Sequence, residues 1–361
     1  MIRHKQADLP LHGGQAPAWL FKRMTRLAGI LCEFISIEFS PEELLYRLAD
    51  PIWFQAFGCV LGFDWHSSGL TTVTCGAIKE AYKRRGNSLG IHVAGGKGSV
   101  SRKTPEEIDR IASDNAIAVG SKLIYASKIS AKVDSSAVQD GYQLYHHCFF
   151  FDDAGRWAVV QQGMNEDTRY ARRYHWFAEN SINVNFVNEP HTGIITDKCV
   201  ENVLNMIARK SAEARRRVVD ISKEKPEMII DDFVTEGNLF FPAHHDIRLN
   251  PVEANNLRKI MRKINENQPE SFEELLGIKG VGAKTIRSLA LIAELLYNTP
   301  VSRSDPARYS FAHGGKDGHP FPVDRQLYDN NIAFLEDVLL RAKFNPNEKD
   351  NALRRLQRMI S

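Results

Sequence analysis

The residues best suited to chemistry in this sequence surround a glycine turn at 279–282. This turn, Lys-Gly-Val-Gly, interrupts an otherwise helical stretch and is followed by Lys284. Glycine has no Cβ atom, so the backbone can approach a ligand closely, and the first amides of the next helix lie at the positive end of its dipole. A phosphate oxygen fits such a turn, and Lys279 and Lys284 add positive charge. The alternative is a glycine-rich turn within a helical bundle.

A second set of polar residues lies in and beside a predicted β-hairpin. Residues 142–151 and 156–162 are strand-like, and the segment 152–155 between them, Asp-Asp-Ala-Gly, is typical of a hairpin turn. Neither face of the first strand is cleanly polar, so we expect both faces to be covered. Buried polar side chains need partners, so this cluster is either a nuclease-like or base-reading pocket or a polar network in the core. Its members are Asp134, Asp140, His146, His147, Gln161, Gln162 and Asn165.

In the nuclease interpretation this cluster would require a divalent metal, Mg²⁺ or Mn²⁺. Asp140 and His146 are the candidate ligands, because Mg²⁺ prefers carboxylates whereas histidine favours Mn²⁺ or Zn²⁺. The five cysteines are scattered without a C-x-x-C pair, so we expect neither a zinc ribbon nor a four-cysteine iron–sulfur cluster.

A basic segment at 168–177 could contact the backbone of a nucleic acid. It is predicted to form a helix that places Arg169, Arg172 and Arg173 on one face and aromatic residues on another. Arginines beside aromatic rings suit a nucleic-acid backbone. An amphipathic helix with a solvated face would have the same pattern.

A short strand is predicted at 90–94, and a glycine–lysine loop follows it. The loop and the residues just after it contain Lys97, Arg102 and Lys103. Strand, loop and helix in this order form a phosphate-binding layout, so the loop could hold a backbone phosphate. The spacing of an ATP-binding loop is absent, so we expect no nucleotide cofactor. A flexible loop ahead of a helix capped by Thr104 is the alternative.

The elements that must position these residues are mostly helices. A capping-box pattern begins a short helix at Ser271, and a second helix is expected over Ala283–Tyr297. A long helix is also expected over about 198–225, where Pro226 ends it. With the predicted hairpin, these elements indicate a mostly helical α+β fold. We expect an N-terminal α+β domain over residues 1–190 with the polar cluster, and a helical domain over 191–361 with the glycine turn.

The composition is that of a soluble globular protein, with 43% hydrophobic and 25% charged residues among 361. A formal net charge of +3 does not by itself indicate a nucleic-acid-binding protein, so any such surface must be local. We expect an intracellular protein that neither enters nor crosses a membrane, because a signal peptide and long apolar runs are missing and the cysteines show no disulfide pattern.

The stretch 271–297 resembles a helix-hairpin-helix, the GVG-type clamp for DNA phosphates. It is also similar to helix-hairpin-helix DNA glycosylases, in which GVG-x-K-T precedes a Val-Asp that opens the next helix. Here the Val-Asp ends at Asp324, after an insert at 298–321 that is longer than usual in that family. The resemblance implies that Lys284 forms a Schiff base and that Asp324 is the catalytic aspartate. A helix N-cap is the alternative role for Asp324.

Several other segments resemble one uncharacterised family, a domain of unknown function found in archaea and bacteria. The resemblance covers nearly the whole chain and implies a shared architecture without an assigned activity. The segments are ADLPLHGG, GFDWHSSG, AGGKG, KVDSSAVQDGYQLYHH, QQGMN, GVGAKT, AHGGKDG and PVDR.

Together these observations predict a DNA-binding protein that processes DNA lesions or strands, as DNA-repair enzymes do. Three hypotheses remain open: a glycosylase/lyase acting through Lys284 and Asp324, a metal-dependent nuclease with its site in the N-terminal domain, and a non-catalytic adaptor. The nuclease would use the polar cluster around Asp134, His147 and Gln162. The residues predicted to contact DNA are Lys279, Gly280, Val281, Gly282, Lys284, Thr285, Lys97, Arg102, Lys103, Arg169, Arg172 and Arg173.

Overall fold

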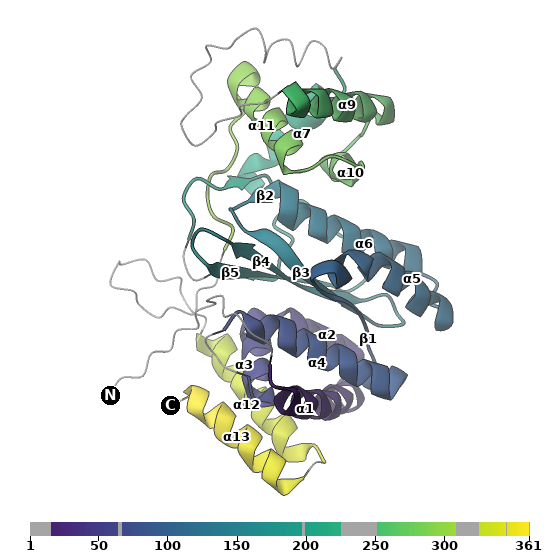
Figure 1. Ribbon diagram of the computed structural model, residues 1–361, viewed down its shortest axis with the longest axis vertical. Coiled ribbons are helices and arrows are strands. Elements are labelled where there is room, and N and C mark those ends of the chain that lie inside the picture. Colours follow the sequence, from purple (N-terminus) through teal and green to yellow (C-terminus); the bar gives the residue numbers. More distant parts are fainter. Residues whose placement is uncertain are drawn as a thin grey trace.

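A five-stranded antiparallel sheet of order β1-β3-β4-β5-β6 forms the middle of the molecule (Figure 1). The computed structural model describes residues 16–63, 67–196, 199–224, 251–307, 325–343 and 345–360. The strands are β1 (His92–Lys97), β3 (Gln143–Phe151), β4 (Trp157–Asn165), β5 (Tyr170–Ala178) and β6 (Gly193–Ile195). The predicted hairpin is confirmed as β3 and β4, joined by a tight turn in which Gly155 has a φ of +84°.

Helices from both ends of the chain cover one face of the sheet. Cys148, Phe150 and Val160 point from the strands into this layer, where they join a core that includes Trp53 and Leu335. The helices are α1 (Ala18–Glu38), α2 (Pro41–Ala49), α3 (Pro51–Leu61), α4 (Gly69–Arg85), α12 (Arg325–Arg341) and α13 (Pro346–Ile360).

Helices α5 (Thr104–Asp114) and α6 (Gly120–Lys132) cover the opposite face. The strand residues that alternate with the first set, including Phe149, Trp157 and Trp176, are buried against them. Both faces of β3 are therefore covered, as its sequence predicted. The short helices η1 (Gly86–Leu89) and η2 (Gly98–Lys103) flank β1.

A third group of helices occupies the end of the molecule beyond α6 (Figure 1). It includes α7 (Ala212–Ser222), α9 (Pro251–Asn267), α10 (Phe272–Gly277) and α11 (Ala283–Tyr297), with the ribbon of β2 (Val138–Gln139) and β7 (Leu204–Asn205) beneath them. In contrast, α12 and α13 return to pack against α1 and α3. Residues 191–361 therefore contribute helices to both ends of the molecule.

Two predicted helices are wrong. Residues 168–177 form strand β5 with the turn before it, because their aromatic residues have high β-propensity and both arginines of the strand find partners inside the fold. Arg172 pairs with buried carboxylates, whereas Arg173 donates to uncharged acceptors. The long helix expected over about 198–225 is reduced to α7, preceded by β7 and the short helix η4 (Arg209–Ser211). Within the described part of the chain, no helix combines the length and apolarity needed to cross a membrane.

Candidate functional site

A buried chain of hydrogen bonds links α6, the sheet and the loop before β6. Asp134 lies in the π-helical turn η3 (Val133–Ala137) and accepts from Gln161 Nε2 at 2.6 Å and from Trp176 Nε1 at 2.9 Å. His191 Nε2 lies 2.5 Å from the other oxygen of Asp134. The Asp134 carboxylate is fully buried, and three side chains hydrogen-bond to it. Asp134 is therefore the centre of the network.

The same chain continues through His147 to Ser127. Since the amide nitrogen of Gln161 donates to Asp134, its Oε1 accepts from His147 Nδ1 at 2.9 Å. His147 Nε2 is then an acceptor for the Ser127 hydroxyl, also at 2.9 Å. Burial lowers the pKa of His147, so its ring stays neutral. Ser127 is itself buried, so this serine and histidine act as structural partners.

A second buried network is centred on Arg172, whose side chain is fully buried on the α6 face of β5. Its guanidinium makes a two-pronged contact with Asp305, at 3.0 and 2.7 Å, and a 2.8 Å contact with Asp140. Tyr174 also donates to Asp140, at 2.7 Å. Burial raises the pKa of Asp140, and the positive charge of Arg172 opposes this effect.

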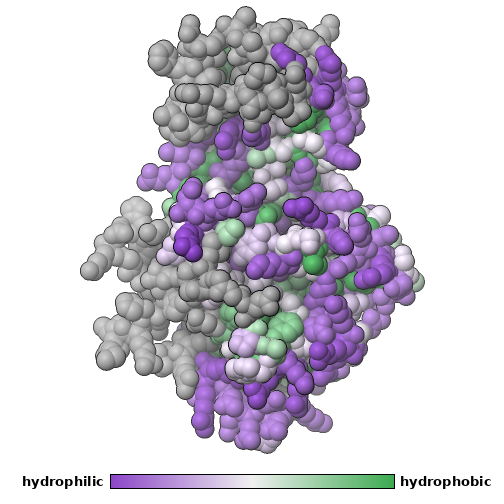
Figure 2. Space-filling view, viewed as in Figure 1, coloured by the Kyte–Doolittle hydropathy of each residue, from purple (hydrophilic) through white to green (hydrophobic). Residues whose placement is uncertain are grey.

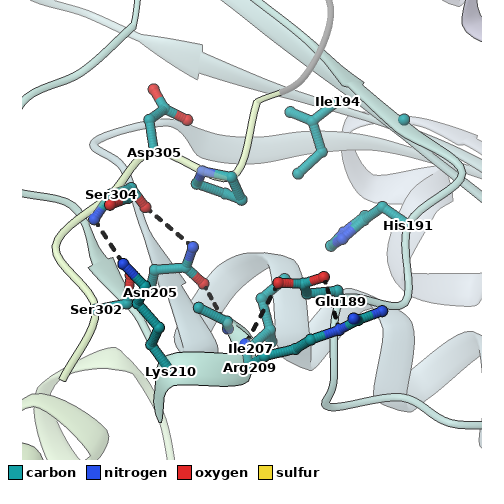
Figure 3. A pocket seen from close by; sticks show the side chains of 13 residues that line it. Glu189, His191, Ile194, Asn205, Ile207, Arg209, Lys210, Ser302, Ser304 and Asp305 are labelled. Atoms are coloured by element: carbon teal, nitrogen blue, oxygen red, sulfur yellow. Dashed lines mark hydrogen bonds and ion pairs between the residues drawn. The ribbon is translucent and has the colours of Figure 1, made fainter.

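Both networks end at one cavity, which has a volume of about 440 Å³. His191 lies on one side of it, Asp305 and Ile194 lie on another, and Glu189 with Arg209 closes a third (Figure 3). Its lining residues are Glu189, His191, Gly193, Ile194, Asn205, Ile207, Ala208, Arg209, Lys210, Ser302, Ser304, Asp305 and Pro306.

The His191–Asp134 pair could support acid–base chemistry in this cavity. When the ring is neutral and Nε2–H donates to the carboxylate, Nδ1 is the unprotonated nitrogen, and no described residue hydrogen-bonds to it. A carboxylate that fixes the tautomer and orientation of a histidine in this way leaves the other nitrogen available to take a proton from a ligand or a water.

The glycine turn joins α10 to α11 as predicted. Ser271 Oγ accepts from the amide of Glu274 at 3.1 Å, which confirms the cap of the first helix. Gly280 has a φ of +105°, a backbone conformation that favours glycine. Val281 is fully buried and anchors the turn, whereas Lys279 is exposed.

The amide end of α11 is open to solvent on one side. Gly282 is its N-cap without a side-chain cap, and a Cβ added at Gly282 would meet nothing within 4 Å. Lys284 is exposed, whereas Thr285 is buried. Two further lysines hold the backbone of the turn: Lys132 Nζ donates to the carbonyl of Val281, and Lys263 Nζ donates to that of Lys279 at 3.1 Å.

The polar cluster predicted from the hairpin is divided between the two faces of the sheet. His147 lies across the β3–β4 pair from Gln161, and His146 lies across it from Gln162. Gln162 Nε2 donates to the carbonyl of Ser68 at 3.0 Å and to the hydroxyl of Tyr145, away from the Asp134 network. These residues therefore form separate networks instead of one pocket.

The metal prediction gains no support from the donor set. Asp140 is occupied by Arg172 and Tyr174, and among the described residues no three His, Cys, Asp or Glu side chains gather where they could hold a metal ion. Asp324, the predicted catalytic aspartate, lies outside the described residues.

The predicted arginine face does not exist, because its members point in different directions. Arg169 is exposed in the β4–β5 turn with a φ of +60°. Arg173 is buried on the opposite face of the sheet from Arg172, where it donates to Gln55 at 2.9 Å and to the carbonyl of Pro51 at 3.2 Å. Neither buried arginine is on a surface that DNA could reach.

The glycine–lysine segment is ordered by its neighbours. Strand β1 extends to Lys97, and a Cβ at Gly95 would lie 2.2 Å from the carbonyl oxygen of His147, so only glycine fits this close pairing. Lys97, Arg102 and Lys103 are exposed at this edge. These three residues stay predicted DNA contacts, and they belong to a different part of the fold from the turn before α11.

The burial of His146 predicts how the stability of the protein depends on pH. It is buried, neither ring nitrogen has a hydrogen-bond partner in the part of the chain described, and burial lowers its pKa from 6.5 to about 3. Between pH 6.5 and about pH 3, His146 is protonated in the unfolded state but not in the folded state. The free energy of unfolding therefore falls as the pH drops below 6.5. His146→Leu should remove this loss and gain about 2 kcal/mol relative to the unmodified protein between pH 7 and pH 5.

Urea unfolding of both proteins at several pH values measures this difference. The same pH dependence in both would contradict a neutral, buried His146.

The sequence did not reveal His191, Asp305 or Glu189. They lie in segments 178–197 and 298–321, whose sequences show neither helical nor strand-like periodicity. Asp134 is 57 residues from His191, and Arg172 is 133 residues from Asp305, so only the folded chain brings them together. The one local sign of these site residues was the polar sequence Asn-Glu-Pro-His at 188–191.

The described residues thus define a mostly helical α+β protein with a polar cavity beside its sheet and a glycine turn at one end. The chain belongs to the family described as "Protein of unknown function (DUF763)", which matches residues 5–323. This match confirms the resemblance to an uncharacterised family. Comparison with curated proteins and with solved structures gives no match.

Proposed function

We propose that this protein binds DNA through backbone phosphates at the turn between α10 and α11, and that it acts in DNA processing. The observation that carries the proposal is the exposed glycine turn at the uncapped start of a 15-residue helix, with Lys279 and Lys284 exposed beside it. The turn resembles a helix-hairpin-helix. Amides and helix dipole both favour an anion there.

The surroundings of the turn support a local positive surface. Besides the two exposed lysines, Lys132 and Lys263 donate to backbone carbonyls of the turn. Figure 2 shows mostly hydrophilic side chains where Figure 1 places α9 and α10, and those of α10 include the acidic Glu273 and Glu274. A net charge of +3 gives little long-range attraction, so this concentration of lysines is what would attract a phosphate backbone.

One possible reaction is that of a glycosylase/lyase, with Lys284 as the nucleophile. A lysine reacts as a nucleophile only when it is neutral, and burial in apolar surroundings favours that form. Lys284 is exposed, so burial does not supply this activation. The similarity of the GVGAKT segment to glycosylases is what favours this reaction.

The lyase proposal predicts a covalent adduct. A Schiff base with abasic DNA should be trapped by borohydride in the unmodified protein and should be lost in Lys284→Ala. Lys22→Ala is the control, because it removes an exposed lysine of α1 that is away from the turn and should keep the adduct. The absence of an adduct with abasic, uracil-containing and oxidised-guanine DNA would leave Lys284 as a phosphate contact at most.

A hydrolytic reaction is the second candidate, and the His191–Asp134 pair at the cavity favours it. Incubating the protein with labelled plain and damaged DNA, with and without Mg²⁺ or Mn²⁺, separates the candidates. Cutting of plain DNA supports a nuclease, and metal-free action on damaged DNA supports the glycosylase. DNA binding without cleavage identifies an adaptor, and no DNA binding contradicts the proposal itself.

A further inference from the structure

The cavity between β6, β7 and the segment 302–306 is not needed for a phosphate contact at the α10–α11 turn. Its volume of about 440 Å³ is within the range of small-molecule sites. We propose that this cavity binds a nucleotide: its phosphate contacts the basic residues at the mouth, and its base lies between the apolar walls. The nucleotide could be free or could be the end of a DNA strand.

The phosphate end of the site is formed by η4. Arg209 and Lys210 are adjacent, exposed and both line the cavity. The Arg209 side chain is 79% exposed and lies 3.3 Å from Glu189, so it can turn toward an incoming anion. Lys210 pairs with no acidic side chain in the described part of the chain. In Figure 3 the Arg209 guanidinium lies on the Glu189 side of the cavity and Lys210 lies on the Ser302 side, so the mouth carries a cation on each side. Guanidinium and ammonium groups both bind phosphate.

The inner part of the cavity suits an aromatic base. Ile194, Ile207 and Pro306 provide apolar walls. In the neutral ring of His191, Nε2–H donates to Asp134, so Nδ1 can accept from an amino or imino N–H of a base. A nucleotide combines the three features that this lining requires: an anion, a flat apolar surface and a hydrogen-bond donor.

The wall of the cavity is held rigidly, as expected of a preformed site. Glu189 has a φ of +51°, an uncommon conformation for a residue with a side chain, and its amide donates to the carbonyl of Ile207 at 2.9 Å. Asn205 Nδ2 donates to the carbonyl of Ser304 at 3.0 Å, and Asp305 is fixed by Arg172. Strain and buried ion pairs at one cavity are more typical of a functional site than of a surface loop.

Calorimetric titration at low salt tests the proposal with two probes: the four deoxynucleoside 5′-monophosphates, and a short single-stranded oligonucleotide with a 5′-phosphate. Lys210→Ala should weaken binding about tenfold or more, which corresponds to at least about 1.4 kcal/mol. Ser304→Trp, at an exposed position on the rim, should block binding. Arg216→Ala is the matched control, because Arg216 is an exposed arginine of α7 outside the cavity lining, and it should bind like the unmodified protein.

Binding of either probe that both cavity variants reduce supports the site, and the probe that binds identifies the source of the nucleotide. No binding of either probe, or binding that Lys210→Ala and Ser304→Trp leave unchanged, overturns it. Inorganic phosphate that binds as tightly as a nucleotide would also overturn it, because the apolar walls would then contribute nothing. The turn at Gly282 is tested by separate variants, so failure of the cavity proposal leaves the proposed DNA contact intact.

Discussion

Replacing Arg172 with methionine is expected to lower the free energy of unfolding by about 3–5 kcal/mol. Methionine keeps the unbranched stem, but it leaves Asp140 and Asp305 without the positive charge that they share. Asp140 is 2% exposed, so water cannot replace the missing partner. Urea unfolding at neutral pH measures the loss.

Arg169→Met is the control for this change, because Arg169 is exposed in the turn before the same strand. Surface substitutions of this kind usually change stability by less than about 0.5 kcal/mol. If Arg172→Met lost no more stability than Arg169→Met, the buried Arg172 network would be contradicted.

The second large effect is expected at the glycine turn. Replacing both Gly280 and Gly282 with valine should weaken DNA binding about tenfold or more, equally for unrelated sequences, because phosphate contacts carry no base information. Valine at Gly280 is strained by the φ of +105°, whereas Gly282 is extended and has open space beside it. The single variant Gly282→Val should therefore fold normally and still keep a phosphate away from the amides.

Gly277→Val is the matched control for these variants. Gly277 ends α10, and a Cβ there meets nothing within 4 Å. Fluorescence anisotropy with two unrelated duplexes gives the affinities. A folded Gly282→Val protein that binds DNA as tightly as the Gly277→Val protein would remove the turn from the DNA interface.

Local signals in the sequence were enough for part of the fold. The β3–β4 hairpin and the α10–turn–α11 unit were predicted because turn residues, alternation and a serine cap act within a few residues. The fold class follows from the same signals. Strand β5 was not predicted, since its arginines look solvent-exposed until their distant partners Asp305 and Gln55 are known.

The candidate cavity could not be predicted from the sequence for the same reason. His191 becomes notable only because a π-helical turn at the end of α6 places Asp134 beside it. The histidines of β3 attracted attention by their position in an aromatic strand, yet His146 and His147 lie on opposite faces of the sheet. Residue types identified polar clusters, whereas the long-range pairing decides which polar groups share a site.

The salt dependence of DNA binding tests the central claim most directly. If Lys279 and Lys284 each contact a phosphate, replacing both with alanine should reduce the slope of log affinity against log salt by about two units. Replacing Lys22 and Arg23, two exposed basic residues of α1 at the other end of the molecule, removes the same charge and should leave the slope unchanged. Equal slopes for the lysine variant and the unmodified protein, or no DNA binding at all, would contradict a phosphate contact at the α10–α11 turn.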